Sequence, residues 1–538
     1  MTGKKKEISK RFRKPRRTFE KSGTVDPEMS YYVSLENVVN TDKQDIKTMV
    51  DRGRYFSIFA PRQSGKTTFL KHLCRELHKE RTYIAVLLSF QKYSKLGVEK
   101  FYAQIQKTLY KQLIDRLSVL ECEKCDEIKT YLDNHDLTDH ISFGDLFEEL
   151  NRIIEFKKIV IFIDEFDGIP LDELENFLMT LRDLYLEYKD DKQKALYSVG
   201  LVGIRNITKL IVGGVSPFNI ADQVDLPPFS LKNVRDLFYQ YTEETNQPFT
   251  EEAVKKVHEE TGGQPWLVNR IGTILTVDIK PGTVEPIDET DVEQAIRILI
   301  AERNIHFDNL YEKAKLYKET FVEIVFDNVE YNPDDEDQTW LEQYGLIKNK
   351  QGHAVVANNL YKSRYIKTFF REVKADEDIS PHAYALPGNR LDMKRIILNF
   401  EQYIAKIGVS AFYKEKKPYE RTGQFLLTAW LYQFVKGGEG DLRYEVRTGM
   451  GRMDIILIYK GKKYIVETKV NRHDDITRLL EEGVLQVSRK YLAAEAVDEG
   501  YLVVFDTKTH IGAVCEPRNH KEGDKQVTSF IIGIGRSD

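Results

Sequence analysis

The stretch that decides the fold of the N-terminal half is APRQSGKT, Ala60 to Thr67. It follows a short apolar run, YFSIF at residues 55–59, and precedes a segment at residues 65–80 whose apolar side chains recur with helical spacing. The stretch matches the pattern GxxxxGK followed by Ser or Thr, except that Ala60 replaces the first glycine. A strand, such a loop and a helix surround a phosphate with backbone N–H groups. The sequence therefore predicts a phosphate-binding loop.

The residues at the end of this loop have expected roles. Gly65 lets the backbone curl, Lys66 reaches the β and γ phosphates, and Thr67 holds Mg²⁺. Thr68, the next residue of the predicted helix, completes the set of candidate nucleotide-binding residues at the loop. We expect the ligand to be ATP with Mg²⁺.

A second motif supports this expectation. The apolar run IVIFI, residues 159–163, is typical of a central parallel strand, and it ends in Asp164 and Glu165. At the carboxyl end of such a strand, Asp164 is positioned to take part in the Mg²⁺ shell. Glu165 is positioned to orient or deprotonate the attacking water. The pair predicts a Walker B motif and ATP hydrolysis.

Two further segments complete the first half. A predicted strand at residues 195–203 runs into Arg205 and Asn206, which are the candidate sensors of the γ-phosphate. Downstream, LPPF at residues 226–229 and a helical stretch lead to TGGQPWLVNRI at residues 261–271.

The motifs APRQSGKTT, IFIDEFD, SPFNI and GGQPWLVN together resemble the AAA-like and STAND-related ATPases over residues 30 to 300. The resemblance implies a P-loop core with a parallel sheet and a small helical lid, in which a GxP-type turn reads the nucleotide. We expect the core at residues 31–228 and the lid at residues 229–300. Residues 301–378, where Gly345 and Gly352 flank two short β-prone runs, resemble a winged-helix module that touches DNA or packs against the ATPase.

The second half carries its chemistry on a predicted hairpin. YEVRTGMGRMDIILIYKGKKYIVETKV, residues 444–470, has the pattern of three strands separated by glycine-containing turns. A two-residue turn at Lys460 and Gly461 places Asp454 opposite Glu467. Lys469 projects from the same face as Glu467.

Two carboxylates facing each other across a strand pair destabilise it unless a cation lies between them. Asp454 and Glu467 are therefore predicted oxygen ligands of Mg²⁺ or Mn²⁺. The ammonium of Lys469 is placed to position a water or to stabilise developing charge. These three residues are the candidate catalytic set for phosphodiester hydrolysis.

The spacing of Asp454, Glu467 and Lys469 after a helix resembles the PD-(D/E)XK nuclease core over residues 390 to 510. The resemblance implies an α/β/α restriction-endonuclease-like domain, here at residues 385–538, which cleaves DNA with a divalent metal. Met453 stands where the pattern has proline.

Other ligands of this site are left open by the sequence. The acid that the resemblance expects on the leading helix is Glu420, or it is replaced by Gln424, and Glu445 is either a further ligand or a surface residue. Gln486 and Tyr491 are five residues apart rather than the usual four, which predicts poorly matched helix faces.

Composition sets the outer limits. The chain has 538 residues, 41% apolar and 31% charged, which is ordinary for multidomain globular proteins. No apolar run approaches the roughly 20 residues of a membrane span, so we expect a soluble, cytoplasmic protein without a membrane partner. Four cysteines provide no disulfide framework, and the lone pair Cys122 and Cys125 lacks two further ligands for zinc.

The N-terminus is strongly basic. Residues 4–21 hold ten Lys or Arg against two Glu, and we expect residues 1–30 to form a disordered arm that is either solvated or bound to phosphate backbones.

Two functions fit these motifs. The leading one is an ATPase that regulates a metal-dependent nuclease acting on DNA, and the resemblance suggests defence against foreign DNA. The alternative is a nucleotide-dependent sensor or scaffold whose inactive nuclease fold binds nucleic acid or a protein partner. Either function is compatible with a homo-oligomer.

Overall fold

The computed structural model describes residues 11–121, 124–154, 157–190, 196–204, 219–326, 329–372, 381–407, 413–414, 417–418, 422–435, 440–448, 451–472, 475–513 and 515–535. The chain divides into two compact units. Unit 1 comprises Met1–Leu316, Asn332–Lys348 and Val356–Leu360, and unit 2 comprises Tyr317–Tyr331, Asn349–Val355 and Tyr361–Asp538. Among the described helices, none combines the length and the apolar composition that a bilayer crossing needs.

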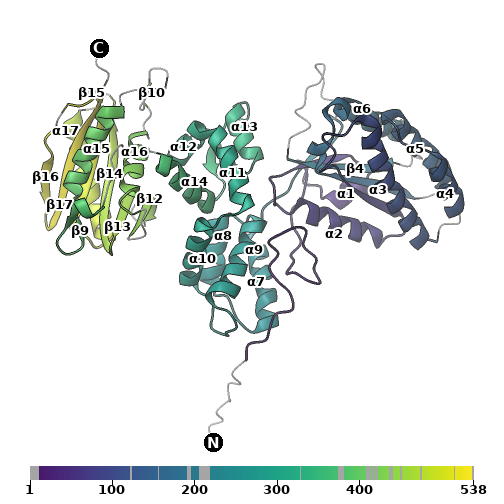
Figure 1. Cartoon of the computed structure of the whole chain (residues 1–538), viewed down its shortest axis with the longest axis horizontal. Coiled ribbons are helices and arrows are strands. Elements are labelled where there is room, and N and C mark those ends of the chain that lie inside the picture. Colours follow the sequence, from purple (N-terminus) through teal and green to yellow (C-terminus); the bar gives the residue numbers. More distant parts are fainter. Residues whose placement is uncertain are drawn as a thin grey trace, which may run out of the picture. The chain divides into compact units, whose positions relative to one another are not determined.

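Unit 1 contains a parallel five-stranded sheet with the order β2-β3-β4-β1-β5. Figure 1 labels strand β4 of this sheet among the helices α1 to α6. Its strands are β1 (Phe56–Phe59), β2 (Tyr83–Ser89), β3 (Lys158–Asp164), β4 (Leu196–Gly203) and β5 (Asp222–Asp225). The helices that accompany this sheet are α1 (Ile46–Asp51), α2 (Lys66–His78), α3 (Val98–Val119), α4 (Cys125–Asn134), α5 (His140–Ile153) and α6 (Leu171–Asp190), with a short 3-10 helix η1 (Phe166–Gly168). The predicted parallel α/β core is confirmed.

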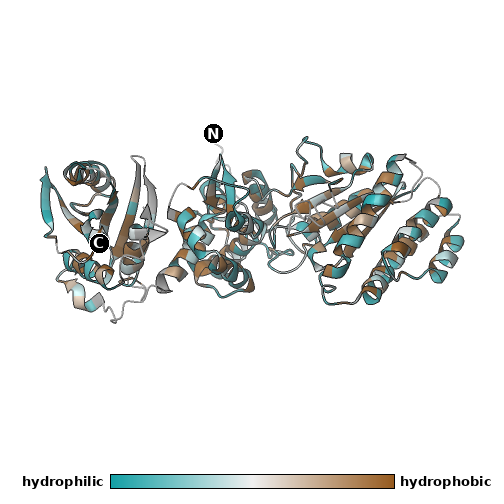
Figure 2. Ribbon diagram, turned by 90° about the horizontal axis from the view of Figure 1, so that it is seen from above, coloured by the Kyte–Doolittle hydropathy of each residue, from teal (hydrophilic) through white to brown (hydrophobic). Residues whose placement is uncertain are grey.

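Both faces of this sheet are covered. On β3, Ile159, Ile161 and Ile163 belong to one hydrophobic cluster, which includes residues of α3, α5 and α6. Val160 and Phe162 belong to a second cluster, which includes residues of α1 and α2. Because successive side chains of a strand point to opposite faces, a strand covered on both sides must be apolar throughout. Figure 2 shows the result as largely brown strands between helices that carry teal outward.

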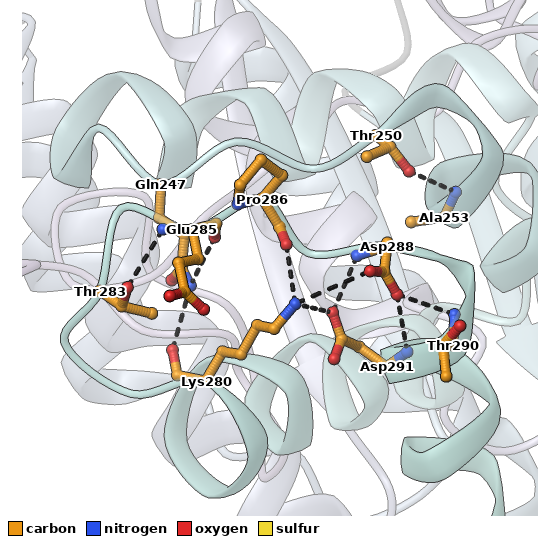
Figure 3. Close-up of polar contacts among 10 residues, drawn as sticks. All are labelled: Gln247, Thr250, Ala253, Lys280, Thr283, Glu285, Pro286, Asp288, Thr290 and Asp291. Carbon is orange, nitrogen blue, oxygen red and sulfur yellow. Dashed lines mark hydrogen bonds and ion pairs between the residues drawn. The ribbon is translucent and has the colours of Figure 1, made fainter.

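The predicted lid is helical. It consists of α7 (Leu231–Thr245), α8 (Glu251–Thr261), α9 (Pro265–Thr273), a π-helical turn η3 (Ile274–Ile279) and α10 (Glu289–Ala301). Lys280 closes the loop between η3 and α10, because its ammonium donates to the Pro286 carbonyl at 2.9 Å and to the Asp291 carboxylate at 2.5 Å (Figure 3). Burial opposes the charge of this lysine, but Asp291 and Asp288 raise its pKa. The loop is therefore tied to the start of α10.

The N-terminal segment differs from the prediction of a disordered arm. Residues 1–10 lie outside the described residues, but residues 11–30 pack against the lid. Phe19 is 5% exposed, and its ring contacts those of Tyr31 and Phe238. The Tyr31 hydroxyl donates to Glu244 at 2.7 Å. The basic composition pointed to a solvated tail, and the aromatic site that binds it is formed by α7, more than 200 residues away.

The segment after the lid contains helices and one hairpin. Its elements are α11 (Ile305–Leu316), α12 (Lys318–Phe326), α13 (Glu336–Gln343), β6 (Ile347–Lys350), β7 (His353–Val356) and α14 (Asn359–Glu372). The two predicted β-prone runs form the pair β6-β7, and Gln351 and Gly352 turn the chain with positive φ. The boundary between the two units passes through this segment, and its winged-helix character stays a prediction.

Unit 2 is built on a six-stranded sheet with the order β12-β13-β14-β15-β17-β16. Strands β12 (Gly440–Thr448), β13 (Gly451–Tyr459) and β14 (Lys462–Asn471) are antiparallel. Strands β15 (Glu499–His510) and β17 (Lys525–Gly535) continue it in parallel, and β16 (Arg518–Glu522) pairs antiparallel with β17. The helices are α15 (Met393–Ile407), α16 (Thr422–Tyr432), α17 (Ile476–Gln486), π-helical η6 (Val487–Tyr491) and α18 (Leu492–Ala494). Short elements are η4 (Pro381–Tyr384), β8 (Ala385–Leu386), β9 (Arg390–Leu391), β10 (Tyr413–Lys414) and β11 (Lys417–Pro418).

Helices cover both faces of this sheet. Leu502 and Val504 of β15 share a hydrophobic cluster with residues of α17 and η6. Phe505, which alternation turns to the other face, contacts Phe400 of α15 at 6.3 Å between ring centroids. A side chain at Gly423 of α16 would also meet Phe505. Unit 2 therefore has helix, sheet and helix layers.

Candidate functional site

The phosphate-binding loop has the predicted geometry. Gly65 directly precedes α2 as its N-cap and has φ +91°, a conformation that favours glycine. The next residue, Lys66, is 7% exposed, and its Nζ donates to the carbonyls of Ala60 and Pro61, both at 2.7 Å. Burial lowers the pKa of Lys66, and the carboxylates of Glu165 and Asp164 act against that shift. The ammonium is thus held across its own loop.

The two residues predicted to hold Mg²⁺ lie together. Thr67 Oγ1 donates to Asp164 Oδ2 at 2.5 Å, although the residues are 97 positions apart. Asp164 is the last residue of β3 and is 3% exposed. A hydroxyl and a buried carboxylate are hard oxygen donors of the kind that Mg²⁺ takes up. This pair fits the predicted cation.

Glu165 follows directly in a left-handed backbone conformation, with φ 52° and ψ 43°. Its N–H donates to Asp164 Oδ1 at 2.9 Å. Burial and the charge of Asp164 raise the pKa of Glu165, whereas Lys66 and Arg62 lower it. Such a conformation is unfavourable for a residue other than glycine and is often found at functional sites. It occurs at the point where the chain leaves β3.

The end of β4 also reaches this edge of the sheet. The Ala60 N–H donates to the Gly203 carbonyl at 3.2 Å, and the Ile204 N–H donates to Asp167 Oδ2 at 2.6 Å. The predicted sensors Arg205 and Asn206 come next but lie outside the described residues. Asp167, the second Asp of IFIDEFD, was not singled out from the sequence, and its position in that motif was the available signal.

The predicted lid turn contacts the loop. Gly263 has φ +74°, and a Cβ there would lie 2.0 Å from the Phe229 carbonyl oxygen, so LPPF and GGQP are packed backbone to backbone. Gln264 accepts from the Leu267 N–H at 2.7 Å, which caps α9. Its Nε2 donates to the Gln63 carbonyl at 3.1 Å. The lid therefore binds the loop directly through one glutamine.

A largely apolar pocket opens beside Gly65. Its lining comes from three segments, with Tyr31 and Leu35 before the core, Gly65 and Thr68 at the loop, and Phe229 and Asn269 in the lid. Thr68 Oγ1 accepts a hydrogen bond from the Val25 N–H at 3.2 Å. The pocket therefore adjoins the phosphate loop. The contribution of residues 25–35 to it was not predicted.

The hairpin of unit 2 has the predicted register. Lys460 and Gly461 have φ 45° and 80°, as a two-residue turn with positive φ at both positions requires. Pairing runs from Tyr459↔Lys462 to Ile455↔Val466. Beyond that pair, Asp454 Oδ2 accepts from the N–H and the hydroxyl of Thr468 at 2.8 and 2.6 Å. The Asp454 carboxylate thus lies where the two strands separate.

Glu467 is the unusual carboxylate of this site. It is 2% exposed, and Lys469 Nζ lies 3.1 Å from its Oε1. Among the described residues, none hydrogen-bonds its buried Oε2. Burial and the charge of Asp454 raise the pKa of Glu467 to about 8 against the effect of Lys469. An unpartnered buried carboxylate oxygen is unfavourable, so the pair of Asp454 and Glu467 fits a cation.

The expectation of poorly matched helix faces was wrong. Gln486 and Tyr491 are bridged by the π-helix η6, whose wider turn brings residues five apart to one side. Gln486 Nε2 donates to the Tyr491 hydroxyl, and Gln486 Oε1 accepts from Lys469 Nζ at 3.0 Å. Burial raises the pKa of Tyr491 to about 12, with the charge of Glu467 adding to the shift. Consecutive hydrogen bonds therefore link Tyr491, Gln486 and Lys469.

The third acid of this site is not located. Glu420 lies outside the described residues, and Gln424 on α16 is 2% exposed. The pairs on either side of Glu445 place its backbone opposite Asp454. In the described part of the chain no group of three His, Cys, Asp or Glu residues is arranged to hold a metal. The cysteines described, Cys74, Cys125 and Cys515, are free thiols, whereas Cys122 lies outside the described residues.

Comparison with protein families gives two matches. The profile of a family described as "AAA-like domain" matches residues 20–368. The profile of a family described as "Domain of unknown function (DUF8371)" matches residues 391–509. None of the curated proteins matches the chain.

Similar solved structures include the Walker-type ATPase of Pyrococcus abyssi, with 13% identity, a TM-score of 0.41, and coverage of 62% of this chain and 99% of that one. The Thermotoga maritima RuvB Holliday junction branch migration motor has 12% identity, a TM-score of 0.30, and coverage of 59% and 90%. Cdc6p of Pyrobaculum aerophilum has 13% identity, a TM-score of 0.29, and coverage of 60% and 88%. Likenesses at this level carry no conclusion about function.

Proposed function

Because the chain belongs to the family of proteins with an AAA-like domain, we propose that it is an ATPase whose nucleotide state regulates a metal-dependent nuclease domain acting on DNA. The ATPase half is supported by the hydrogen bond between Thr67 and Asp164, which joins the ends of two motifs distant in sequence. Thr67 and Asp164 are 97 positions apart, so folding of the core, and not local sequence, brings them into contact.

At the loop, the proposed roles follow from the contacts. Lys66 is held by two carbonyls and would exchange them for the β and γ phosphates. Thr67 and Asp164 would hold Mg²⁺, which supplies charge neutralisation on the phosphates when bound. Glu165, with its raised pKa, would orient the attacking water and accept its proton. Gln264 would couple the conformation of the loop to that of the lid, because its side chain is hydrogen-bonded to the Gln63 carbonyl.

The proposal of a nuclease domain rests on Glu467, a buried carboxyl group that lies beside Asp454 and Lys469 and has one oxygen without a partner among the described residues. The order of a helix, three antiparallel strands, a helix and a parallel strand supports a PD-(D/E)XK-like fold. Asp454 and Glu467 would hold a divalent metal, which supplies Lewis-acid activation when bound. Lys469, oriented by Gln486, would stabilise charge on the phosphate.

A DNA contact is also proposed for the segment before unit 2's sheet. The order α12, α13, hairpin β6-β7 supports a winged helix. Its turn at Gln351 and Gly352 is exposed and would form the wing. The basic residues 4–21 would add non-specific contacts with phosphates.

The direct test is incubation of the full chain with plasmid and single-stranded DNA, with Mg²⁺ or Mn²⁺, in the presence and absence of ATP. We expect metal-dependent cleavage that changes with ATP and that falls by at least about a hundredfold in Asp454→Asn. ATP hydrolysis should persist in this variant, because the loop residues are unchanged. Equal cleavage by the variant and the wild type would refute the assigned metal site.

The second candidate function is a nucleotide-dependent sensor or scaffold with an inactive nuclease fold. The observation in its favour is that the described residues contain no group of three metal-ligating side chains. Calorimetric titration with Mn²⁺ separates the two functions. Binding that is lost in Asp454→Asn supports the nuclease, whereas DNA binding without Mn²⁺ uptake supports the scaffold.

A further inference from the structure

The turn between α13 and β6, residues 344–346, packs against the phosphate-binding loop. Gly345 in this turn has φ +76°, and a Cβ added there would lie 2.5 Å from Cγ and 2.7 Å from Cβ of Pro61. Both distances are shorter than non-bonded carbon atoms allow, so only glycine leaves room for the proline ring. The α13–β6 turn is therefore in direct contact with the loop.

Pro61 is also a residue that holds the Lys66 ammonium. Its carbonyl oxygen accepts hydrogen bonds from Lys66 Nζ at 2.7 Å and from Ser64 Oγ at 2.8 Å. The ring and the carbonyl of a proline share one Cα, and the ring fixes φ. A displacement of the ring would therefore move the oxygen that binds Lys66.

The turn is fixed by its own hydrogen bonds. The Gly345 N–H donates to the Glu342 carbonyl at 2.8 Å, and the Leu346 N–H donates to the Leu341 carbonyl at 2.9 Å. These two bonds are the pattern that ends a helix at a glycine in the left-handed conformation. Leu341 and Leu346 are fully buried. The turn can therefore act as a firm support for the loop.

Further contacts connect the turn to the lid. The Leu346 carbonyl accepts from the Ala357 N–H at 2.9 Å. A Cβ at Gly262 would lie 2.9 Å from the Ala357 carbonyl oxygen. Two residues further on, Gln264 donates to the Gln63 carbonyl of the loop. The loop is thus contacted by the turn and by the lid, and these two supports contact each other.

We propose that Gly345 is a positioning residue for ATP hydrolysis, which acts through Pro61 to hold the phosphate loop in the conformation that presents Lys66 to the nucleotide. This inference rests on the proposed ATPase activity and adds to it a segment that follows the lid. Gly345 has no contact with the nucleotide in this role. Its contribution is the space that it leaves for the Pro61 ring.

The test compares two glycines that precede and follow β6. Gly345→Ala places a methyl group against Pro61, whereas the added methyl group of Gly352→Ala has no atom within 4 Å. Both positions have positive φ, at +76° and +82°, so the backbone strain is matched. We expect Gly345→Ala to hydrolyse ATP roughly ten- to a hundredfold more slowly than Gly352→Ala, because Lys66 is displaced. Phosphate release is measured well below the unfolding temperature of each variant.

A second substitution separates positioning from a general loss of stability. Pro61→Gly removes both carbon atoms that the new methyl group would meet. In the Pro61→Gly background, Gly345→Ala should therefore reduce ATP turnover no more than Gly352→Ala does. A defect that came only from strain in the turn would be equally large in both backgrounds.

A measurement on the unsubstituted chain decides the matter if Gly345→Ala does not fold. Hydrogen exchange at the Gly345 and Leu346 N–H groups should slow a few-fold when a non-hydrolysable ATP analogue binds, because an ordered loop supports the turn. The Gly352 N–H, which donates to Asn349 Oδ1 at 3.0 Å, should exchange at the same rate with and without the analogue.

The outcomes separate failure of the inference from failure of the proposed function. Equal turnover in Gly345→Ala and Gly352→Ala would overturn the inference while leaving the ATPase intact. A defect of Gly345→Ala that persists undiminished in the Pro61→Gly background would also overturn it, as would exchange in the turn that does not respond to the analogue. If the folded wild type neither binds nor hydrolyses ATP, the proposed function fails and the inference with it.

Discussion

The phosphate loop of unit 1 and the acidic site of unit 2 satisfy their polar groups in different ways. At the loop, the Lys66 ammonium is bound by two carbonyls, and the Thr67 hydroxyl is bound by Asp164. In unit 2, Lys469 contacts Glu467, but the second oxygen of that carboxylate has no partner among the described residues. Its pKa is raised to about 8.

Each site would therefore respond differently to its ligand. Groups that bond one another are stable without a ligand, and a nucleotide must compete with existing hydrogen bonds. In unit 2, Glu467 would repel Asp454 across the strand pair once it is ionised, and a cation would relieve that repulsion. We therefore expect substitutions at the first site to reduce mainly catalysis. At the second site, we expect substitutions and pH to change mainly the stability of unit 2.

The largest effect is expected from Glu165→Gln. The amide keeps the shape of the side chain but cannot accept a proton, so ATP hydrolysis should fall by roughly 10² to 10⁴ while ATP binding is retained. Turnover is measured by phosphate release and binding by calorimetry. Glu175→Gln, on the exposed part of α6, is the matched control and should hydrolyse ATP normally. A loss of binding in Glu165→Gln would show that this residue has a structural role.

Lys66→Ala should have the next largest effect. It removes the cation that would contact the β and γ phosphates, and we expect hydrolysis to fall by on the order of 10² to 10³. Lys79→Ala, at the exposed end of α2, is the control with the same substitution. Unchanged turnover in Lys66→Ala would show that the loop does not take part in ATP hydrolysis.

The third prediction concerns pH and the stability of unit 2. In metal-free buffer, folded Glu467 keeps its proton up to about pH 8, whereas an unfolded glutamic acid loses it near 4.3. The folded state therefore binds more protons in this window. The contribution of Glu467 to the stability of unit 2 should be fully present below about pH 4 and should be lost as pH rises towards 8, by on the order of 2 to 4 kcal/mol.

This dependence is measured as the difference in urea unfolding between the wild type and Glu467→Gln from pH 5 to 9. Mn²⁺ should flatten it in the wild type, because the cation favours the ionised carboxylates. Glu481→Gln, on the exposed face of α17, should behave as the wild type does. If the stability of the wild type relative to Glu467→Gln does not fall with pH, Glu467 is not destabilised by ionisation, and the stated difference between the two sites is wrong.

The smallest effect is expected from Tyr491→Phe. The ring still fills the core, but Gln486 loses its hydroxyl partner, and unfolding stability should fall by about 1 kcal/mol. Because Gln486 also binds Lys469, DNA cleavage should fall a few-fold with unchanged Mn²⁺ affinity. A double-mutant cycle with Gln486→Ala checks the coupling. Additive effects would show that the chain of side chains does not position Lys469.

Much of each site could be predicted because its pattern is local. The register between Asp454 and Glu467 follows from a two-residue turn, and the structure confirms it as far as Ile455↔Val466. The buried strand before Asp164 follows from an uninterrupted apolar run. In both cases the deciding residues are within one hairpin or one strand.

Other features could not be read in this way. Residues five apart on an α-helix diverge by about 140°, so the spacing predicts different faces for Gln486 and Tyr491, whereas the π-turn η6 brings them to one side. Charge alone pointed to disorder at residues 11–30, because the rings that bury Phe19 belong to a distant helix. Short-range patterns do not report such partners.

Residue patterns along the chain are sufficient to predict the phosphate loop with Lys66 and Thr67 and the hairpin that carries Asp454 and Glu467. The burial of Glu467 and the lack of a hydrogen-bond partner for one of its oxygens among the described residues appear only in the folded chain. The physical reason is that spacing along a chain sets which residues share a face. Burial and the lack of a hydrogen-bond partner depend on every segment that packs around a group, including segments hundreds of residues away.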